Sequence, residues 1–207
     1  MNIIIVGAGI AGLSTAWSLA KRGHGVILLE QGQVPNPLSA SGDHHRIIRR
    51  AYPAGSGYGR AITEAYGAWE EMWADLGRRH YDHRGFFCVS RETGDEAEDY
   101  LNGLKQGGFP FELLTAEEAA GRWPFLDPRT IRYAYFSEEG GALHCRRIAD
   151  GLDEWLRAND VDLRERTKVV AVDADAATVT LADGEVLTAD MVVVTAGAWV
   201  TNLFPDI

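Results

Sequence analysis

The chain has 207 residues, of which 46% are hydrophobic and 24% charged, and it carries a formal net charge of −10. This composition is typical of a globular protein with a substantial core, and the acidic balance argues against nucleic acids and anionic lipid surfaces as partners. Because an apolar strand pattern starts at Asn2 and no apolar run approaches the length of a membrane span, we expect a soluble, cytoplasmic protein without membrane association. Cys88 and Cys145 fit no metal-binding pattern, and we expect reduced thiols, with a disulfide as the alternative.

The N-terminal segment has the pattern of a nucleotide-binding unit. A run of apolar β-formers from Ile3 to Val6 predicts a buried parallel strand, and Gly7 permits a tight turn after it. Gly9 allows the backbone to approach a pyrophosphate, and Gly12 allows the following helix to lie against the strand. The free N–H groups at the start of that helix favour a negatively charged ligand.

A second predicted strand, from about Val26, ends at Glu30. A carboxylate in this position can accept both hydroxyls of an adenosine ribose, and it disfavours a 2′-phosphate. The ordered combination of strand, glycines, helix and acid favours a dinucleotide site, either for NAD or for FAD. The alternative is a plain βαβ unit whose glycines serve only packing.

A predicted loop, residues 31–43, is rich in Pro, Ser and Gly and leads into a cationic segment. If that segment is locally helical, Arg46 and Arg49 lie on one face, where each can make a bidentate contact with a carboxylate or phosphate. The alternative is that these arginines are surface residues paired with the plentiful acids. The adjacent His44 and His45 make a poor chelating pair, and we expect no metal site.

Residues 58–76 have apolar and aromatic side chains at alternating steps of four and three, which predicts a helix with one core-facing side. Residues 81–139 have a different pattern of predicted elements from the segments before them. It contains a strand-like run near 85–89, an acidic helix, a strand near 109–114, and a short helix that opens with a capping box at Thr115 and Glu118. We interpret this segment as the first part of an inserted, smaller domain.

The last third of the chain returns to alternating structure. An amphipathic helix is predicted over residues 146–158, followed by short strands with a hairpin turn at Asp183-Gly184. A final buried strand, 191–194, runs into the small-residue turn 195–199, which permits close approach to a ligand. The predicted fold class is therefore α/β. A Rossmann-like domain, with a parallel sheet, helices and a β-meander, is expected over residues 1–80 and 140–207, and part of an α+β domain over 81–139.

Several motifs in this order resemble one family over the whole chain. They are the N-terminal fingerprint, the Arg46-Ile47-Ile48-Arg49 segment, the Thr115–Glu118 helix, the Gly140–Leu143 turn and the closing Thr195–Trp199 turn. The chain resembles the amine-oxidising, FAD-dependent oxidoreductases related to D-amino-acid oxidase, and among them the monomeric sarcosine oxidase and N-methyltryptophan oxidase subgroup. The resemblance implies FAD as the cofactor.

The resemblance also implies roles for individual residues. The cofactor would contact Gly7, Ala8, Gly9, Ile10, Ala11, Gly12, Glu30, Gln31, Ser41, His45, Arg46, Val169 and Gly197. Among these, the fingerprint glycines would hold the pyrophosphate, Glu30 the ribose, and Val169 the adenine. Gly197 would lie near the ribityl chain and Arg46 beside the isoalloxazine. Arg49 would act in catalysis by pairing with the substrate carboxylate. The implied reaction oxidises the C–N bond of a small amine or amino acid to an imine, with molecular oxygen as the final acceptor in the complete enzyme.

The chain departs from this family in two respects. Gly42 stands where the subgroup has a histidine, which leaves the substrate open, and members are nearly twice as long as 207 residues. A partial chain of an oxidase is therefore expected, with a complementary C-terminal fragment as a possible partner. The alternatives are one subunit of a split oxidase, a non-catalytic dinucleotide-binding remnant, and an NAD-dependent dehydrogenase.

Overall fold

The computed structural model describes residues 1–206, which form two compact units. The first consists of Met1–His45 together with the described residues from His144 onward, and the second of Arg46–Leu143. The division expected from the sequence, at residues 80 and 140, concerns functional domains and stays a prediction. None of the helices in residues 1–206 has the length and apolar composition needed to cross a membrane. Cys88 and Cys145 form no disulfide in the described chain.

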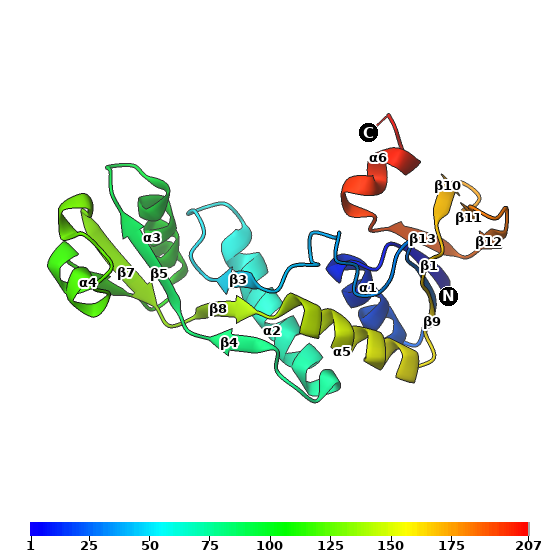
Figure 1. The fold of residues 1–207 in the computed structure, drawn as a ribbon, viewed down its shortest axis with the longest axis horizontal. Helices are drawn as coiled ribbons and strands as arrows, with labels where there is room; N and C mark the ends of the chain where they lie inside the picture. The colour runs from blue at the N-terminus through cyan, green and yellow to red at the C-terminus, as the bar shows by residue number, and fades with distance from the viewer. Residues whose placement is uncertain (207) are drawn as a thin grey trace. The chain divides into compact units, whose positions relative to one another are not determined.

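A four-stranded parallel sheet organises the first unit (Figure 1). Its order is β13-β1-β2-β9, and the strands are β1 (Asn2–Val6), β2 (Gly25–Leu29), β9 (Asp162–Arg164) and β13 (Met191–Val194). In the ladder, Ile4 of β1 lies opposite Ile27 of β2 and Val192 of β13. The predicted parallel sheet is confirmed.

Strand β1 is buried on both faces, which explains its unbroken apolar run. Ile4 and Val6 pack in a cluster with residues of an antiparallel meander, including Val179 and Leu181. Since side chains alternate along a strand, Ile3 and Ile5 face the other side of the sheet, where the helices α1 (Ile10–Lys21) and α5 (Cys145–Ala158) contact each other. The sheet is thus the middle layer of three.

The meander is the antiparallel sheet β10-β11-β12, as predicted. Its strands are β10 (Val169–Asp173), β11 (Thr178–Leu181) and β12 (Val186–Thr188). The predicted turn at Asp183-Gly184 is present, with Gly184 at φ +92° and Asp183 Oδ1 accepting a hydrogen bond from Glu185 N. After β13 the chain forms the 3₁₀ turn η2 (Gly197–Trp199) and the short helix α6 (Val200–Leu203).

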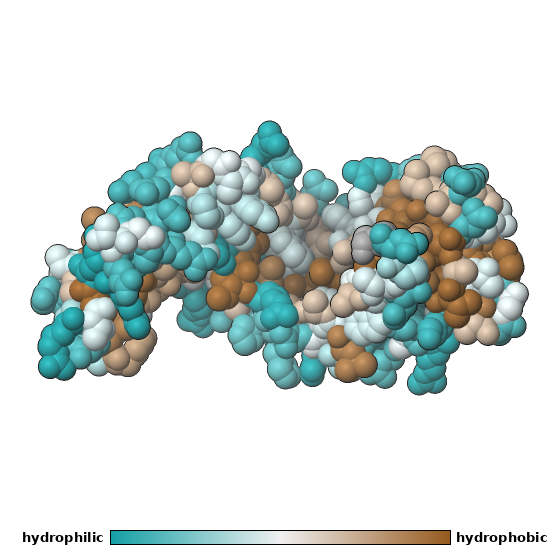
Figure 2. All heavy atoms as spheres, turned by 90° about the horizontal axis from the view of Figure 1, so that it is seen from above, coloured by the Kyte–Doolittle hydropathy of each residue, from teal (hydrophilic) through white to brown (hydrophobic). Residues whose placement is uncertain are grey.

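Strand β13 is an edge of the parallel sheet in the described residues. Met191 at its start is 47% exposed, and Val186 and Val170 of the meander are 58% and 46% exposed. Figure 2 shows hydrophobic side chains, in brown, gathered on the visible face of this unit at the right of the picture. An open edge beside apolar surface is a site where another strand can add.

The second unit contains two antiparallel sheets and three helices. One sheet has the order β3-β8-β4, from β3 (Arg46–Arg49), β8 (Gly140–Leu143) and β4 (Tyr81–His83). The other has the order β5-β7-β6, from β5 (Phe86–Ser90), β7 (Tyr133–Ser137) and β6 (Glu112–Leu114). The remaining elements are α2 (Tyr58–Leu76), α3 (Glu96–Gly107), α4 (Ala116–Arg122) and the 3₁₀ turn η1 (Pro128–Thr130).

The structure departs from the sequence analysis at two segments of this unit. Residues 46–49, which would place both arginines on one face if they were helical, form a strand, so Arg46 and Arg49, three residues apart, point to opposite faces. The segment 140–143, expected as a turn, is the central strand of its sheet. Both assignments depend on the pairing of Arg46 with Leu143 and of Arg49 with Gly140, nearly a hundred residues apart, which no local pattern reveals.

Helix α3 packs directly on backbone at Gly103. A Cβ atom at this position would lie 1.6 Å from the carbonyl oxygen of Tyr52. Gly103→Ala should therefore lower the free energy of unfolding by about 1 to 2 kcal/mol, the cost of moving the surface loop that carries Tyr52. Gly67 in α2 is the matched control, because a Cβ there meets nothing within 4 Å. Gly67→Ala should instead raise the free energy of unfolding by up to about 1 kcal/mol. Urea unfolding of the two variants would show whether their stability changes have opposite signs.

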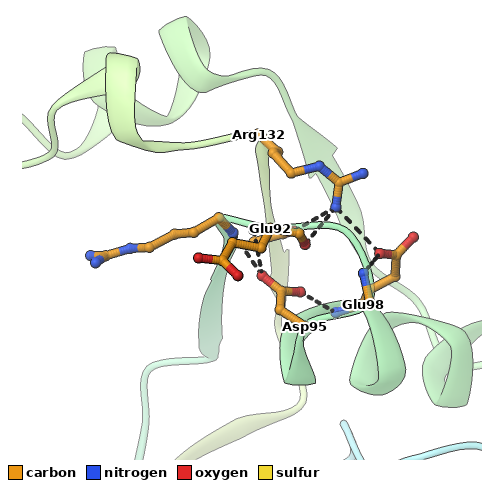
Figure 3. A network of polar contacts seen from close by, with 7 residues as sticks. Glu92, Asp95, Glu98 and Arg132 are labelled. Atoms are coloured by element: carbon orange, nitrogen blue, oxygen red, sulfur yellow. Dashed lines mark hydrogen bonds and ion pairs between the residues drawn. The ribbon is translucent and has the colours of Figure 1, made fainter.

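A polar network fixes the start of α3 (Figure 3). Asp95 caps the helix, its Oδ1 accepting from Glu98 N, while its Oδ2 accepts from Arg91 N and Glu92 N. Glu98 Oε2 accepts from Gly94 N, and Arg132 donates to the Glu92 carbonyl oxygen at 2.7 Å. Partial desolvation raises the pKa of Asp95, but the three N–H donors outweigh it and lower that pKa from 3.8 to about 2.

This network predicts a pH-dependent contribution to stability. At pH 7, Asp95→Ala should lower the free energy of unfolding by about 1 kcal/mol, the usual value of a helix cap. Because the folded-state pKa is depressed, this contribution is complete above pH 4 and is lost as the pH falls toward 2. The gap between wild type and variant, measured by urea unfolding, should close over that range. Asp99→Ala, an exposed residue in the same helical turn, should change stability by less than about 0.5 kcal/mol at either pH.

Candidate functional site

A cavity of about 430 Å³ lies within the first unit, at the carboxyl ends of the parallel strands. This edge of an open α/β sheet is where such folds bind ligands. The lining comes from the β1–α1 turn, the end of β2, the loop after it, the β9–β10 connection and the residues after β13. Its residues are Val6, Gly7, Gly9, Ile10, Ala11, Leu29, Glu30, Gln31, Asn36, Leu38, Ser39, Ala40, Ser41, Thr167, Lys168, Val169, Thr195, Ala196, Gly197, Ala198, Trp199, Asn202 and Leu203.

The β1–α1 turn needs its first and third fingerprint glycines for close backbone contacts. Gly7 has φ +102°, and a Cβ there would lie 2.8 Å from the Thr195 carbonyl oxygen. A Cβ on Gly12 would lie 1.8 Å from the Gly7 carbonyl oxygen and 2.8 Å from Thr195 Oγ1. The Thr195 hydroxyl donates to the Gly7 carbonyl at 2.7 Å, so the turns after β1 and β13 are bonded together.

The N-terminus of α1 is prepared for an anion. Gly9 is the N-cap and, being a glycine, makes no side-chain capping hydrogen bond. The first turn of the helix contains no acidic residue. Ser41 Oγ accepts a hydrogen bond from Ile10 N at 3.0 Å. The other N–H groups of a first turn lack intrahelical partners and attract negative charge. A Cβ on Gly9 would meet only Ser41 Oγ, at 3.6 Å, so this glycine leaves open space and not a packed contact.

Glu30 lies directly after β2 and is 5% exposed. Its Oε2 accepts from Ala8 N at 2.9 Å, while its Oε1 accepts from Gly32 N at 2.8 Å and from Asn36 Nδ2 at 3.0 Å. These donors hold the buried carboxylate in one orientation at the cavity wall. A carboxylate has about four acceptor positions, so three donors leave one of them for a ligand.

The loop after Glu30 contributes wall residues that the sequence did not single out. Asn36 is buried, at 8% exposure, and its backbone carbonyl oxygen accepts a hydrogen bond from Ser39 Oγ at 2.8 Å. Ser39 Oγ lies 3.2 Å from Ser41 Oγ. A loop rich in Pro and Ser gives no periodic signal of which polar side chain turns inward. The available hint was a set of short polar residues, Asn36, Ser39 and Ser41, six to eleven positions after the predicted acid.

The cavity brings together many, but not all, of the residues predicted for the cofactor. Those that line it are Gly7, Gly9, Ile10, Ala11, Glu30, Gln31, Ser41, Val169 and Gly197. Ala8 and Gly12 are buried beside it, and His45 is exposed at the end of the first segment of this unit. Arg46 and Arg49 belong to the second unit, where Arg46 is exposed and Arg49 half-buried.

Arg49 is surrounded by aromatic rings within the second unit. Its guanidinium carbon lies 4.9 Å from the ring centroid of Tyr52, 4.8 Å from that of Tyr100 and 5.3 Å from that of Phe86. Its Nε donates to the Ala51 carbonyl oxygen at 3.0 Å. Cation–π contacts of this kind hold a guanidinium in place while leaving its other N–H groups for an anionic partner. Within residues 1–206, Arg49 forms no salt bridge with a carboxylate.

The cavity suits the ADP portion of a dinucleotide. A pyrophosphate needs a helix N-terminus with close backbone approach, and an adenosine ribose needs an acceptor at the end of the second strand. Gly7, Gly9 and Gly12 supply the first, and the buried Glu30 carboxylate supplies the second. The residues present therefore fit such a group.

Comparison with known proteins agrees with this geometry. The family model described as FAD dependent oxidoreductase, DAO, matches residues 2–207. Human peroxisomal sarcosine oxidase is 26% identical over 202 residues, which cover 98% of this chain and 52% of the relative. The N-methyl-L-tryptophan oxidase of Yersinia pestis (strain Pestoides F) is 24% identical over 211 residues, covering 100% and 56%. The chain thus spans about half the length of these curated relatives.

Solved structures of similar fold include oxidases and a dehydrogenase. NikD, described as an unusual amino acid oxidase essential for nikkomycin biosynthesis, has a TM-score of 0.81 at 23% identity and is covered over 53% of its chain by 98% of this one. L-proline dehydrogenase from P. horikoshii has a TM-score of 0.84 at 20% identity, with 99% of this chain covering 55% of it. The predicted α/β fold with a Rossmann-like FAD-binding domain is confirmed. The chain belongs to the DAO family of FAD dependent oxidoreductases.

Proposed function

We propose that this chain is the cofactor-binding half of an oxidoreductase that oxidises the C–N bond of an amine or amino acid. The observation that carries the proposal is the fingerprint turn beside the buried Glu30 carboxylate, in a chain that matches the FAD family along residues 2–207. FAD, when bound, supplies the two-electron oxidation. The chain itself positions the cofactor, excludes water and fixes charges around it.

The proposed cofactor contacts, apart from Ala8, Gly12, His45 and Arg46, are residues of the cavity wall. Residues 7–12 hold the pyrophosphate through the turn and the N-terminus of α1, assisted by Ser41. Glu30 and Gln31 bind the adenosine ribose, Val169 meets adenine through its backbone, and Gly197 lies near the ribityl chain. His45 and Arg46 are proposed for the flavin side. The domain assignment proposed for this function is residues 1–80 and 140–207 for the cofactor, with 81–139 beginning the substrate domain.

Arg49 is the residue proposed to receive the substrate carboxylate. Its aromatic surroundings support this role, because they retain the guanidinium without neutralising it. The relatives are named as oxidases of sarcosine and of N-methyl-L-tryptophan, which supports a small N-substituted amino acid as the substrate class. Molecular oxygen is the proposed electron acceptor in the whole protein, and the cytoplasm its proposed location.

A complementary polypeptide is the proposed partner of the first unit. The support is the open edge at β13, the exposed Met191 and the apolar surface of the meander. A strand added beside β13 would extend the parallel sheet and cover that surface.

Titration of the 207-residue chain with FAD, ADP and NADH tests the proposed cofactor. We expect the fluorescence of FAD to be quenched when it binds to the protein and ADP to compete with FAD for the site. NADH should show no saturable binding. Calorimetry with ADP provides a readout independent of the flavin. Saturable NADH binding with no response to FAD would replace the oxidase proposal with an NAD-dependent dehydrogenase, and absence of binding by all three would favour a non-catalytic remnant.

A further inference from the structure

The loop of residues 31–43 links the two ends of the proposed cofactor site through hydrogen bonds of its side chains and backbone. The side-chain Nδ2 of Asn36 donates to Glu30 Oε1, and the backbone carbonyl oxygen of Asn36 accepts from Ser39 Oγ. Ser39 Oγ lies 3.2 Å from Ser41 Oγ, which in turn accepts from Ile10 N. A continuous run of hydrogen bonds therefore joins the acid after β2 to the N-terminus of α1.

The two oxygens of Glu30 differ in how many donors they have. Oε1 has two, Gly32 N at 2.8 Å and Asn36 Nδ2 at 3.0 Å, and these fill its acceptor positions. Oε2 has one donor, Ala8 N at 2.9 Å, and retains one acceptor position. The asymmetry depends on Asn36, because without its amide each oxygen would have a single backbone donor.

We propose that Asn36 is a positioning residue that restricts Glu30 to one ribose hydroxyl. The inference rests on the proposed function, and it replaces the expectation that this carboxylate accepts both hydroxyls. A carboxylate with an open position on each oxygen can accept both neighbouring hydroxyls of a ribose. With Oε1 filled, only Oε2 receives a hydroxyl, and the other hydroxyl contributes little through Glu30.

Binding of deoxy analogues to the 207-residue chain tests this asymmetry. The probes are ADP, 2′-deoxy-ADP and 3′-deoxy-ADP, measured by calorimetry. For the wild type, removal of one hydroxyl should weaken binding roughly tenfold or more, the usual effect of losing a hydrogen bond to a charged group, and removal of the other less than about threefold. In Asn36→Ala the two losses should become equal within about threefold.

Ser39→Ala is the matched control for a merely structural role of the loop. Ser39 bonds the Asn36 carbonyl oxygen and contacts Ser41 but does not touch Glu30. Loss of the Ser39 hydroxyl should weaken the binding of all three ligands by the same factor and leave the ratios of their dissociation constants unchanged. If Asn36→Ala does not fold, Asn36→Ser serves instead, because a serine hydroxyl can still accept from Leu38 N but is too short to reach Glu30.

Each outcome decides the inference. Unequal losses in the wild type that become equal in the Asn36 variant support it. Equal losses in the wild type, or unequal losses that persist in the Asn36 variant, overturn it while leaving the proposed cofactor intact. Failure of the wild type to bind ADP at all overturns the proposed function, and this inference with it.

Discussion

Replacing Gly12 by alanine should destabilise the first unit by about 3 kcal/mol and abolish nucleotide binding. The added Cβ would lie 1.8 Å from the Gly7 carbonyl oxygen, so α1 and the β1–α1 turn must separate. Neither can move easily, because Gly7 N donates to the Leu29 carbonyl oxygen and Thr195 Oγ1 donates to the Gly7 carbonyl oxygen. Urea unfolding, followed by ADP calorimetry at a temperature where the variant is folded, measures both effects.

Gly9→Ala separates the folding role of these glycines from their binding role. Its Cβ would meet only Ser41 Oγ at 3.6 Å, an ordinary contact, and the backbone at φ −68° accepts alanine. Stability should therefore change by less than about 0.5 kcal/mol. ADP affinity should nevertheless fall at least roughly tenfold, because a methyl group would occupy the space proposed for the pyrophosphate. Unchanged affinity in Gly9→Ala would show that the ligand does not approach this turn.

Glu30→Ala is the second substitution with a large expected effect. The buried carboxylate accepts from Ala8 N, Gly32 N and Asn36 Nδ2, and alanine leaves all three donors without that acceptor. A buried donor without a partner costs about 1 to 3 kcal/mol, and water entering from the cavity recovers part of it. We expect a loss of about 3 kcal/mol in the free energy of unfolding, together with loss of ADP binding.

Glu154→Ala provides the control for Glu30→Ala. It removes an exposed carboxylate from α5 in the same unit, so the change in net charge is identical. Its stability should stay within about 0.5 kcal/mol of wild type, and its ADP affinity should not change. If the two variants unfolded at the same urea concentration, the Glu30 carboxylate would not be the acceptor that the structure shows.

The sequence predicted the first unit well because its signals are local or strongly apolar. Residues 3–6 are apolar without interruption, and that pattern holds only for a strand covered on both faces. In the second unit, the Thr115 cap of α4 was visible for the same reason, since a capping box depends on residues three apart, and both of its hydrogen bonds are present.

The second unit was harder to predict from the sequence because strand β8, the central strand of the sheet β3-β8-β4, contains glycines that are explained only by contacts with residues distant in sequence. A Cβ on Gly140 would lie 2.8 Å from the Phe86 Cβ, and one on Gly141 would lie 2.1 Å from the Asp82 carbonyl oxygen. These residues are small because other strands approach closely, although adjacent glycines usually indicate a turn. Asn36 was missed for a related reason, since its burial follows from the fold of the loop and not from its neighbours in sequence.

The pairing of β1 has a consequence for the order in which the chain can fold. Ile3 of β1 lies beside Met191 of β13, whereas the second unit is one continuous segment from Arg46 to Leu143. During synthesis the second unit can close as soon as its own residues are available, but β1 must wait for β13, a strand that is made after the whole second unit. Until then β1 has the partner β2 on one side and an open edge on the other. The cofactor cavity, whose walls include residues 195–203, is consequently completed only after the second unit has been made.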